Sequence, residues 1–262
     1  MLAGMERPNI LVIAGHDPSG GAGIQADIES AAANGVHAAN VITLLTCQDT
    51  ANVYGVSPVA ATFFQQCLDT AQADMTFAAI KTGVIADPDQ VERIAQLARA
   101  APAVPLVVDP VLRAAGGGNL ADDAVGMAVR EQLFPLADMI TPNAGEARLL
   151  CQGETDIDRC GAQLSAYGCD VLITGGDDDT AEVVNRLYRA GDCVRSDRWP
   201  RLSGTFHGSG CTLASAIAAQ LARGHDPETA LYAAQAYTHR TLEQAFTAGR
   251  GQAIPARWVA PI

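Results

Sequence analysis

Short apolar segments rich in β-branched residues alternate with helical segments along most of this chain. Continuous apolar runs of this kind indicate strands that are buried on both faces, as in parallel sheets. The alternation therefore predicts a layered α/β fold with a largely parallel sheet. The expected strands are Ile10–Ala14, Val41–Leu45, Ala78–Lys81, Leu106–Val108, Met139–Thr141 and Val171–Thr174.

Capping residues followed directly by proline mark three expected helix starts. A side-chain oxygen at the cap accepts hydrogen bonds from free backbone N–H groups, and proline suits the first helical position. No repeat or low-complexity linker interrupts the pattern, so we expect residues 1–262 to form one domain. The three starts are Ser57-Pro58, Asp87-Pro88 and Asp226-Pro227; a hairpin of Glu182–Tyr188 with Asp192–Asp197, and helices after Gly208, are also expected.

Charge and composition restrict the partners of the chain. The 262 residues carry a net charge of −12 without a basic stripe, so we expect neither nucleic acid nor an anionic membrane surface as a partner. Lys81 is the single lysine, so a bound phosphate would need backbone N–H groups, a metal ion and arginine to neutralise it. The seven cysteines form no C-x-x-C pair, and the N-terminus shows no signal-peptide pattern, which favours a cytoplasmic protein.

Residues 204–213, Gly-Thr-Phe-His-Gly-Ser-Gly-Cys-Thr-Leu, lead directly into the alanine-rich apolar segment Ala214–Ala222. If that segment is a helix, the backbone N–H groups of residues 208–211 point out of its N-terminus and form an anion site. We expect such a position to lower the pKa of the Cys211 thiol, which could then act as a base or nucleophile. A glycine-rich turn before a buried helix is the alternative, and this segment alone leaves both open.

Polar clusters follow the expected strands at Gly15–Gly23, Thr46–Asp49, Asp109-Pro110 and Pro142-Asn143. Ligands of open α/β sheets bind outside the carboxyl ends of the strands, so the convergence of these clusters on one edge predicts a site there. Asp27, one turn into the helix after the first cluster, is either a ligand contact or a solvated carboxylate on the helix face.

The first glycine loop is not a phosphate-binding loop of the Walker A type, because no Gly-Lys-Ser/Thr follows it. Gly21-Ala-Gly23-Ile-Gln-Ala26 does fit a dinucleotide-binding fingerprint. However, the second strand ends in Thr46-Cys47-Gln48 and lacks the acidic residue that would hold a ribose. A dinucleotide oxidoreductase would also leave residues 207–212 unexplained, so it is the least favoured class.

Asn143 and Glu146 form an N-x-x-E pattern at an expected helix start. Taken alone, the pattern favours a capping box. The alternative is that Glu146, together with Asp109, holds a Mg²⁺ ion, since magnesium takes one or two carboxylates and otherwise water and substrate phosphates. His207, beside the second glycine loop, is either a ligand contact or a packing residue.

Together these motifs resemble the hydroxymethylpyrimidine and phosphomethylpyrimidine kinases of thiamin biosynthesis, in order and spacing, from about residue 9 to residue 224. The family belongs to the ribokinase superfamily. The resemblance implies a three-layer α/β/α sandwich with a mostly parallel central sheet, and commonly a dimer. The segments that carry it are Ala14–Asp27, Val41-Ile-Thr, Gln48-Asp-Thr50, Lys81-Thr-Gly83, Val107–Val111, Thr141–Glu146 and His207–Thr212.

The resemblance also implies the site. ATP and Mg²⁺ would be the cofactors, and the substrates would be 4-amino-5-hydroxymethyl-2-methylpyrimidine and its monophosphate. Gly208, Ser209, Gly210 and Cys211 would form the catalytic anion hole. Gly15, Asp27, Gln48 and Val84 would bind the pyrimidine; Thr174, Asn143 and His207 would face ATP and its phosphates; Asp109 and Glu146 would organise the metal.

The chain departs from the family on the nucleotide side. Thr174 replaces a lysine, and Ala114-Ala-Gly-Gly-Gly118 lacks the lysine and aspartate common there, whereas Val84 replaces a methionine beside the pyrimidine. Arg113 or Arg186 could supply the missing charge, and the glycines at 116–118 are compatible with a lid.

We therefore expect a two-step kinase that makes the pyrimidine diphosphate. The alternatives are a pyridoxal kinase, whose substrate is also a flat heteroaromatic alcohol, and a catalytically weakened protein that binds or senses a pyrimidine. The missing lysines keep the weakened protein open as an alternative, whereas the intact Gly-Ser-Gly-Cys loop argues against it.

Overall fold

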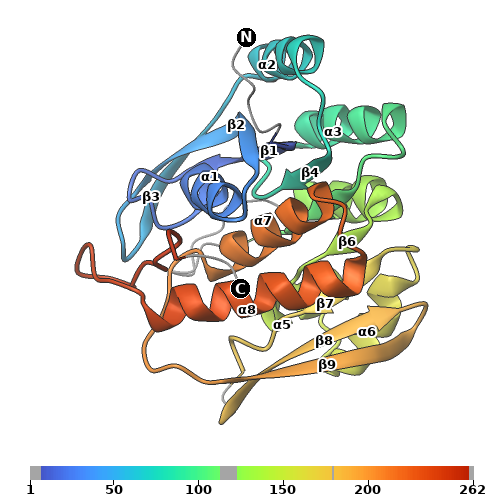
Figure 1. Ribbon diagram of the computed structural model, residues 1–262. Coiled ribbons are helices and arrows are strands. Elements are labelled where there is room, and N and C mark those ends of the chain that lie inside the picture. The colour runs from blue at the N-terminus through green and yellow to red at the C-terminus, as the bar shows by residue number, and fades with distance from the viewer. Residues whose placement is uncertain (1–6, 113–122, 179, 260–262) are drawn as a thin grey trace.

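A single sheet of nine strands runs through the computed structural model, which describes residues 7–112, 123–178 and 180–259 (Figure 1). The strand order is β3-β2-β1-β4-β5-β6-β7-β8-β9. Strands β2, β1, β4, β5, β6 and β7 are mutually parallel, and β3, β8 and β9 pair in the antiparallel sense. The strands are β1 Asn9–His16, β2 His37–Gln48, β3 Val53–Pro58, β4 Ala79–Thr82, β5 Leu106–Val108, β6 Met139–Ile140, β7 Asp170–Ile173, β8 Glu182–Arg189 and β9 Asp192–Pro200.

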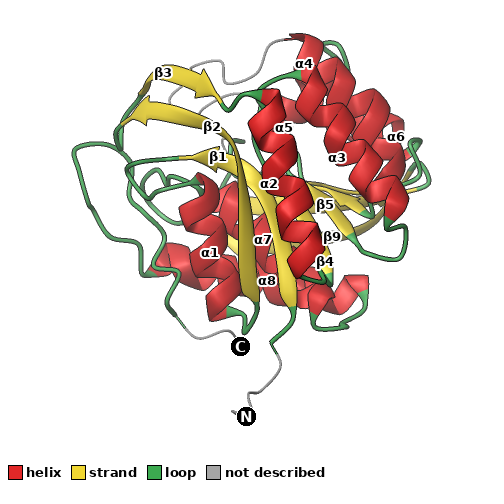
Figure 2. Cartoon of the chain, turned by 90° about the horizontal axis from the view of Figure 1, so that it is seen from above, coloured by secondary structure: helices red, strands yellow, loops and turns green. Residues whose placement is uncertain are grey.

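Helices cover both faces of the sheet, so the molecule has three layers (Figures 1 and 2). One face packs on α2, α3, α4, α5 and α6, and the other on α1, α7 and α8. The helices are α1 Gly23–Ala33, α2 Ala61–Asp74, α3 Pro88–Ala100, α4 Asp123–Ala128, α5 Ala144–Leu150, α6 Ile157–Ser165, α7 Ser209–Ala222 and α8 Pro227–Glu243.

The alternation of side chains along β1 explains why both layers form. Leu11 and Ile13 point into the core under α2 and α3, whereas Ile10 and Val12 point into the core under α7 and α8. All four are fully buried, because successive strand residues face opposite sides of the sheet. The apolar run in the sequence thus reflects a strand that is covered twice, and the expected three-layer α/β/α sandwich is confirmed.

All six expected strands are present, and the expected hairpin is β8 with β9. Asp87 and Asp226 cap α3 and α8 by accepting hydrogen bonds from backbone N–H groups. The helix start expected at Ser57-Pro58 is wrong: these residues end β3, and α2 begins at Ala61. Proline is tolerated there because β3 is an edge strand and needs no second set of backbone hydrogen bonds.

After α8 the chain crosses back to the carboxyl edge of the sheet without a further long helix. Ala253 pairs with Phe206, and Ile254 pairs with Phe246, through isolated bridges. None of the helices in the described part of the chain is long and apolar enough to span a membrane. The glycines at 116–118 lie outside the described residues, so the lid stays a prediction.

Candidate active site

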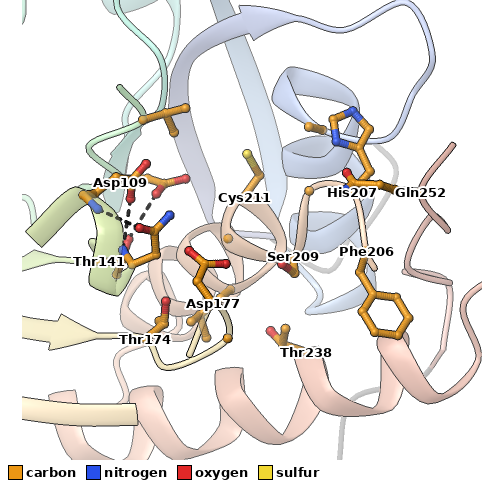
Figure 3. Close-up of a pocket in the computed structure, with 18 of the residues that line it drawn as sticks. Asp109, Thr141, Thr174, Asp177, Phe206, His207, Ser209, Cys211, Thr238 and Gln252 are labelled. Carbon is orange, nitrogen blue, oxygen red and sulfur yellow. Dashed lines mark hydrogen bonds between the residues drawn. The ribbon is translucent and has the colours of Figure 1, made fainter. Parts of the chain in front are cut away.

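A cavity of about 820 Å³ opens at the carboxyl edge of the parallel strands. Its walls come from the loops after β1, β2, β4, β5, β6 and β7, from the start of α7 and from one side of α8. Figure 3 shows Asp109 and Thr141 on one side of this space, His207 on the other, and Cys211 and Ser209 between them. The expected site residues that line it are Gly15, Gln48, Val84, Asp109, Asn143, Glu146, Thr174, His207, Gly208, Ser209, Gly210 and Cys211.

The N-terminus of α7 faces this cavity. Gly208 occupies the capping position with φ +80°, and no side chain caps the helix there. The first intrahelical hydrogen bond runs from Thr212 N to Gly208 O at 3.0 Å, so the N–H groups of residues 209–211 have no carbonyl within the helix to bind. A positive φ favours glycine, and a Cβ at Gly208 would also collide with the carbonyl of Gly21. The helix end therefore offers free donors and a positive dipole end to an anion.

Cys211 lies half-buried in the first turn of α7. Burial raises the pKa of its thiol to about 12, and the carboxylates of Asp109 and Asp27 add to this, although the Lys81 ammonium acts to lower it. The lowered thiol pKa expected from the sequence is therefore wrong. A helix N-terminus favours a thiolate, but burial of the thiol, helped by the two nearby carboxylates, outweighs it. The resting site holds Cys211 as a thiol.

Asp27 does not line the cavity; it is fully buried beneath it, in α1. One of its oxygens, Oδ1, accepts a hydrogen bond from Lys81 Nζ at 2.8 Å and another from Ser215 Oγ at 2.6 Å. Burial acts to lower the pKa of Lys81, but the negative groups around it, Asp27 first and then Cys211 and Asp109, together outweigh burial and raise it. Asp27 thus joins α1, β4 and α7 under the site. The sequence suggested either a ligand contact or a solvated carboxylate, and the observed side chain neither lines the cavity nor reaches solvent.

The N-x-x-E pattern forms the capping box of α5. Asn143 Oδ1 accepts from Glu146 N at 2.8 Å, and Glu146 Oε2 accepts from Asn143 N at 3.0 Å. The capping interpretation is confirmed, yet both side chains also line the cavity. Burial, and then repulsion by Asp109, raise the pKa of Glu146 to about 8.

Asp109 has the character of a cation ligand. It is buried after β5, its Oδ1 receives a long hydrogen bond of 3.5 Å from Thr141, and the Cys211 thiol also interacts with the carboxylate. Its Oδ2 has no hydrogen-bond partner among the described residues. Burial raises its pKa to about 6, although Lys81 acts to lower it. A buried carboxylate oxygen without a partner, beside a second carboxylate that it repels, fits a divalent cation. No cluster of three metal-binding side chains occurs in the described residues, which agrees with an ion that keeps water and substrate ligands.

Asp17 and His207 join the two glycine loops at the cavity wall. Asp17 accepts hydrogen bonds from Ser19 N and Ala22 N, both at 2.8 Å, and lies 2.7 Å from His207 Nε2. Burial acts to raise the pKa of Asp17, but the hydrogen bonds from His207 and Ser19 outweigh it and hold the pKa at about 2. Gln48 Nε2 lies 3.2 Å from the same ring nitrogen of His207. The sequence analysis identified His207 as a candidate but not Asp17. The Asp17-Pro-Ser-Gly20 segment could have indicated Asp17, because an aspartate at the start of such a turn accepts backbone hydrogen bonds.

The nucleotide side of the cavity is ordered by arginine and by an amide network. Arg201 donates hydrogen bonds to the carbonyls of the loop after β7, at Gly176 O (2.9 Å) and Asp178 O (2.6 Å) among others. Asn185 accepts from Gly175 N and donates to Gln235 at 2.8 Å. The backbone next to Thr174 is thereby fixed from two sides.

The structure does not confirm either of the two arginines that the sequence suggested as replacements for the missing lysines. Arg186 does not line the cavity, and Arg113 lies outside the described residues. In the described ranges, the arginines that line the cavity are Arg148 and Arg201. Arg148 lies on α5, is partly exposed, and has Asp178 Oδ1 at 3.7 Å.

The fold is the ribokinase-like architecture shared by small-molecule kinases. Residues 17–256 match the family model described as phosphomethylpyrimidine kinase, and the chain belongs to this family. The hydroxymethylpyrimidine/phosphomethylpyrimidine kinase of Mycobacterium tuberculosis is 37% identical over 255 residues, which cover 95% of this chain and 93% of that protein.

Two further relatives extend this comparison. The thiamine biosynthetic bifunctional enzyme TH1, chloroplastic, of Arabidopsis thaliana is 38% identical over 244 residues, which cover 90% of this chain. The chain spans about half of that enzyme's length, 47%. Among solved structures, the ADP complex of Bacillus subtilis pyridoxal kinase is similar with a TM-score of 0.86 and 28% identity, covering 96% of this chain and 98% of that one.

Proposed function

We propose that this protein uses ATP to phosphorylate 4-amino-5-hydroxymethyl-2-methylpyrimidine to its monophosphate, and the monophosphate to the diphosphate, in thiamin biosynthesis. The open N-terminus of α7 is the observation that carries this proposal. It lies in the cavity between the expected pyrimidine-binding residues Gly15, Gln48 and Val84 and the expected nucleotide-binding residues Thr174 and Asn143.

Phosphoryl transfer needs alignment and charge stabilisation more than covalent help from the protein. The N–H groups of Ser209, Gly210 and Cys211 are free to bind the oxygens of the transferring group. Asp109 and Glu146 would hold Mg²⁺, which supplies positive charge to the phosphates when bound. The orphaned Asp109 oxygen is the support for this assignment.

Gly15 and Val84 pack directly against each other on the pyrimidine side. A Cβ on Gly15 would lie 2.7 Å from Val84 Cγ1 and 2.9 Å from Leu44 Cδ1, so this part of the wall has room for glycine alone. Thr43 Oγ1 donates a hydrogen bond to Val84 O at 2.7 Å and fixes that wall. The amide of Gln48, held beside His207, can exchange hydrogen bonds with a ring nitrogen and an amino group. Asp27 would support this wall from beneath through Lys81.

Arg148 is the cation we expect to neutralise ATP on the nucleotide side. The guanidinium of Arg201 already donates hydrogen bonds to backbone carbonyls. Arg148, in contrast, makes a long ion pair with Asp178 and a 3.4 Å hydrogen bond to Thr155 O, so its guanidinium has donors left for a ligand. Arg148→Ala should raise the KM for ATP by about tenfold, which corresponds to the loss of one hydrogen bond to a charged group. The KM for the pyrimidine should not change. Steady-state kinetics checks this, with exposed Arg159→Ala on α6 as the matched control. An unchanged KM for ATP would exclude Arg148 and leave Arg113→Ala as the next variant.

The function is tested by incubating the purified protein with Mg-ATP and one acceptor, and following the products by mass spectrometry. The acceptors are the pyrimidine alcohol, its monophosphate and pyridoxal. Mono- and diphosphate from the alcohol support the two-step kinase; product from the monophosphate alone would restrict it to the second step. Binding of the pyrimidine without any product would replace the kinase by a pyrimidine-binding protein.

A pyridoxal kinase is the second candidate, because the similarity to the Bacillus subtilis pyridoxal kinase covers nearly the whole chain. Pyridoxal, like the pyrimidine, is a flat heteroaromatic alcohol. A kcat/KM for pyridoxal above that for the pyrimidine alcohol would decide for this candidate.

We also propose that the protein is a homodimer. Leu45, Tyr54 and Val56 expose apolar surface on β2 and on the edge strand β3, and Tyr54 is 65% exposed. Edge strands with apolar side chains are usually covered. Sedimentation of the wild type and of Tyr54→Asp tests the proposal: a monomeric wild type would refute it.

A further inference from the structure

A fully buried arginine, Arg257, joins the two glycine loops of the site from behind. It belongs to the segment that returns after α8, and it does not line the cavity. Every donor group of its guanidinium is engaged. Nε donates to Thr212 Oγ1 at 2.8 Å, Nη1 to Gly20 O at 3.3 Å and Glu29 Oε2 at 3.2 Å, and Nη2 to Gly21 O and, at 3.5 Å, His207 O.

We propose that Arg257 is a positioning residue for phosphoryl transfer: it fixes the directions of the backbone N–H groups that receive the transferring phosphoryl group. This inference rests on the proposed function. Arg257 touches neither substrate nor phosphate, and it acts through the peptide groups of both glycine loops.

The geometry of the peptide bond carries the first step. In a planar trans peptide the C=O and the following N–H point in opposite directions. Arg257 draws the carbonyl of His207 toward the interior, so the N–H of Gly208 is turned the other way, to the side of the cavity. The same fork holds the Gly21 carbonyl, while Asp17 accepts the N–H of Ala22 from the opposite side. That peptide group is clamped at both ends.

Close packing transmits the position of Arg257 to the helix N-terminus. A Cβ built on Gly208 would meet Gly21 O and would lie 2.9 Å from Arg257 Nη2. The capping glycine, the first loop and the guanidinium therefore leave no free space between them. Thr212 completes the link, because its Oγ1 accepts from Arg257 Nε and donates to Gly208 O at 2.8 Å.

Electrostatics argues that stability alone does not explain this arginine. A cation beside a helix N-terminus has the wrong sign for the helix dipole. Its ion-pair partner in the described residues, Glu29, is 34% exposed, so solvent weakens the compensation. Both members of a buried ion pair can often be replaced together by apolar residues without loss of stability. A phosphate bound in front of the loops would add negative charge beside both the guanidinium and the helix N-terminus, which links the arrangement to phosphate chemistry.

The test compares three variants of the full chain. Arg257→Met keeps the length of the side chain without its donors, and Arg257→Lys keeps the charge without the planar fork of donors. Gln220→Met is the matched control: Gln220 is a buried residue of α7 itself, near the end of the helix away from the site, and donates to Asn34 at 2.8 Å. Thermal unfolding is measured for each variant, so that kcat values are compared at known stability.

We expect Arg257→Met and Arg257→Lys to lower kcat by about a hundredfold, the scale seen when one oriented donor of a charge-stabilising site is lost. The KM values for ATP and for the acceptor should stay within about threefold of the wild type. Gln220→Met should lower the Tm with an unchanged kcat. Full activity in Arg257→Lys, or a loss of kcat in Gln220→Met equal to that in Arg257→Met, would overturn the proposal.

A second measurement does not depend on turnover. ADP with aluminium fluoride mimics the transferring phosphoryl group, and its affinity is measured by calorimetry against that of ADP alone. Arg257→Met should weaken binding of the mimic by at least tenfold and leave ADP binding unchanged; equal effects on both ligands would refute the positioning role. If the wild type binds the mimic but phosphorylates none of the acceptors, the proposed function is refuted. The role of Arg257 is then decided by the affinities of wild type and Arg257→Met for the mimic and for ADP.

Discussion

At the scale of single residues, Cys211 shows how one environment changes the chemistry of a side chain. Its place at a helix N-terminus favours a thiolate, but burial and the carboxylates of Asp109 and Asp27 keep it protonated. It can then accept a proton only when bound ligands change the local charge. Such a base matters where the acceptor is an alcohol, which must lose a proton, and matters little where the acceptor is a phosphate already ionised near pH 7.

Cys211→Ala should therefore lower kcat for phosphorylation of the alcohol by about a hundredfold, within the usual range for a general base. The same variant should lower kcat for phosphorylation of the monophosphate by less than about threefold. Single-turnover rates with each acceptor measure the ratio, and Cys47→Ala, an exposed cysteine, serves as the control. Equal losses in both steps would mean that Cys211 supports the helix N-terminus and does not accept a proton.

At the scale of elements, two buried ionic contacts join segments that are distant in sequence. Lys81 of β4 is fully buried with Asp27 of α1, and Ser215 of α7 shares the same carboxylate oxygen. Lys81→Met should destabilise the protein by about 3–5 kcal/mol, because the Asp27 charge is then buried without a partner. The double variant Asp27→Asn/Lys81→Met should recover most of that loss. Urea unfolding measures both; a single variant as stable as the wild type would contradict the expectation.

The contact between Asp17 and His207 gives a second element-scale prediction, the acid sensitivity of the glycine loops. The pKa of Asp17 is about 2 in the folded protein against 3.8 as its ordinary value, so its contribution is complete above about pH 4. As the pH falls from about 4 to 2, the carboxylate is protonated and about 2 kcal/mol is lost. Asp17→Asn should be destabilised by about this amount at pH 7 and match the wild type near pH 2.

Urea unfolding across this pH range checks the prediction for Asp17, with Asp89→Asn on the surface of α3 as the control. A difference between Asp17→Asn and the wild type that does not shrink on acidification would show that Asp17 contributes through packing and not through its charge.

The elements differ in how far the sequence determines them. Buried strands such as Leu106–Val108 follow from local apolar runs, and the caps Asp87 and Asp226 follow from their own neighbours. The helix start predicted at Ser57-Pro58 was wrong because a serine followed by proline also suits the end of an edge strand. Only the order of the strands in the sheet distinguishes the two cases.

The site shows the same division. Residues that follow strands in the sequence, such as Asn143 and Gln48, were found because the carboxyl ends of parallel strands meet. The burial of Asp27 depends on Lys81, 54 positions away, and Arg257 meets Gly20 and Gly21 across more than 200 positions. Contacts between residues so far apart leave no pattern in the neighbouring sequence, so they can be identified only from the folded structure.

At the scale of the whole molecule, the cavity is assembled from nearly the full length of the chain. Its wall runs from Ala14, in β1, to Gln252, in the segment after α8, and the positioning contact of Arg257 comes later still. A site built in this way should form and disappear with the fold as one cooperative unit. Trp199 lines the cavity and reports on it by fluorescence once Trp258, the other tryptophan, is replaced by phenylalanine. Far-UV circular dichroism reports on the helices and strands.

We therefore expect the two signals to give the same Tm, and Mg-ATP with the pyrimidine to raise both together. Ligand at about a hundred times its Kd adds about 2.7 kcal/mol, which corresponds to about 5–10 °C in a chain of this size. Trp199→Phe, followed by circular dichroism alone, controls for an effect of the reporter itself. If the fluorescence transition came first and only it responded to ligand, the site would be a separately unfolding unit, and the contacts of Arg257 and Asp17 would stabilise the loops without tying them to the fold.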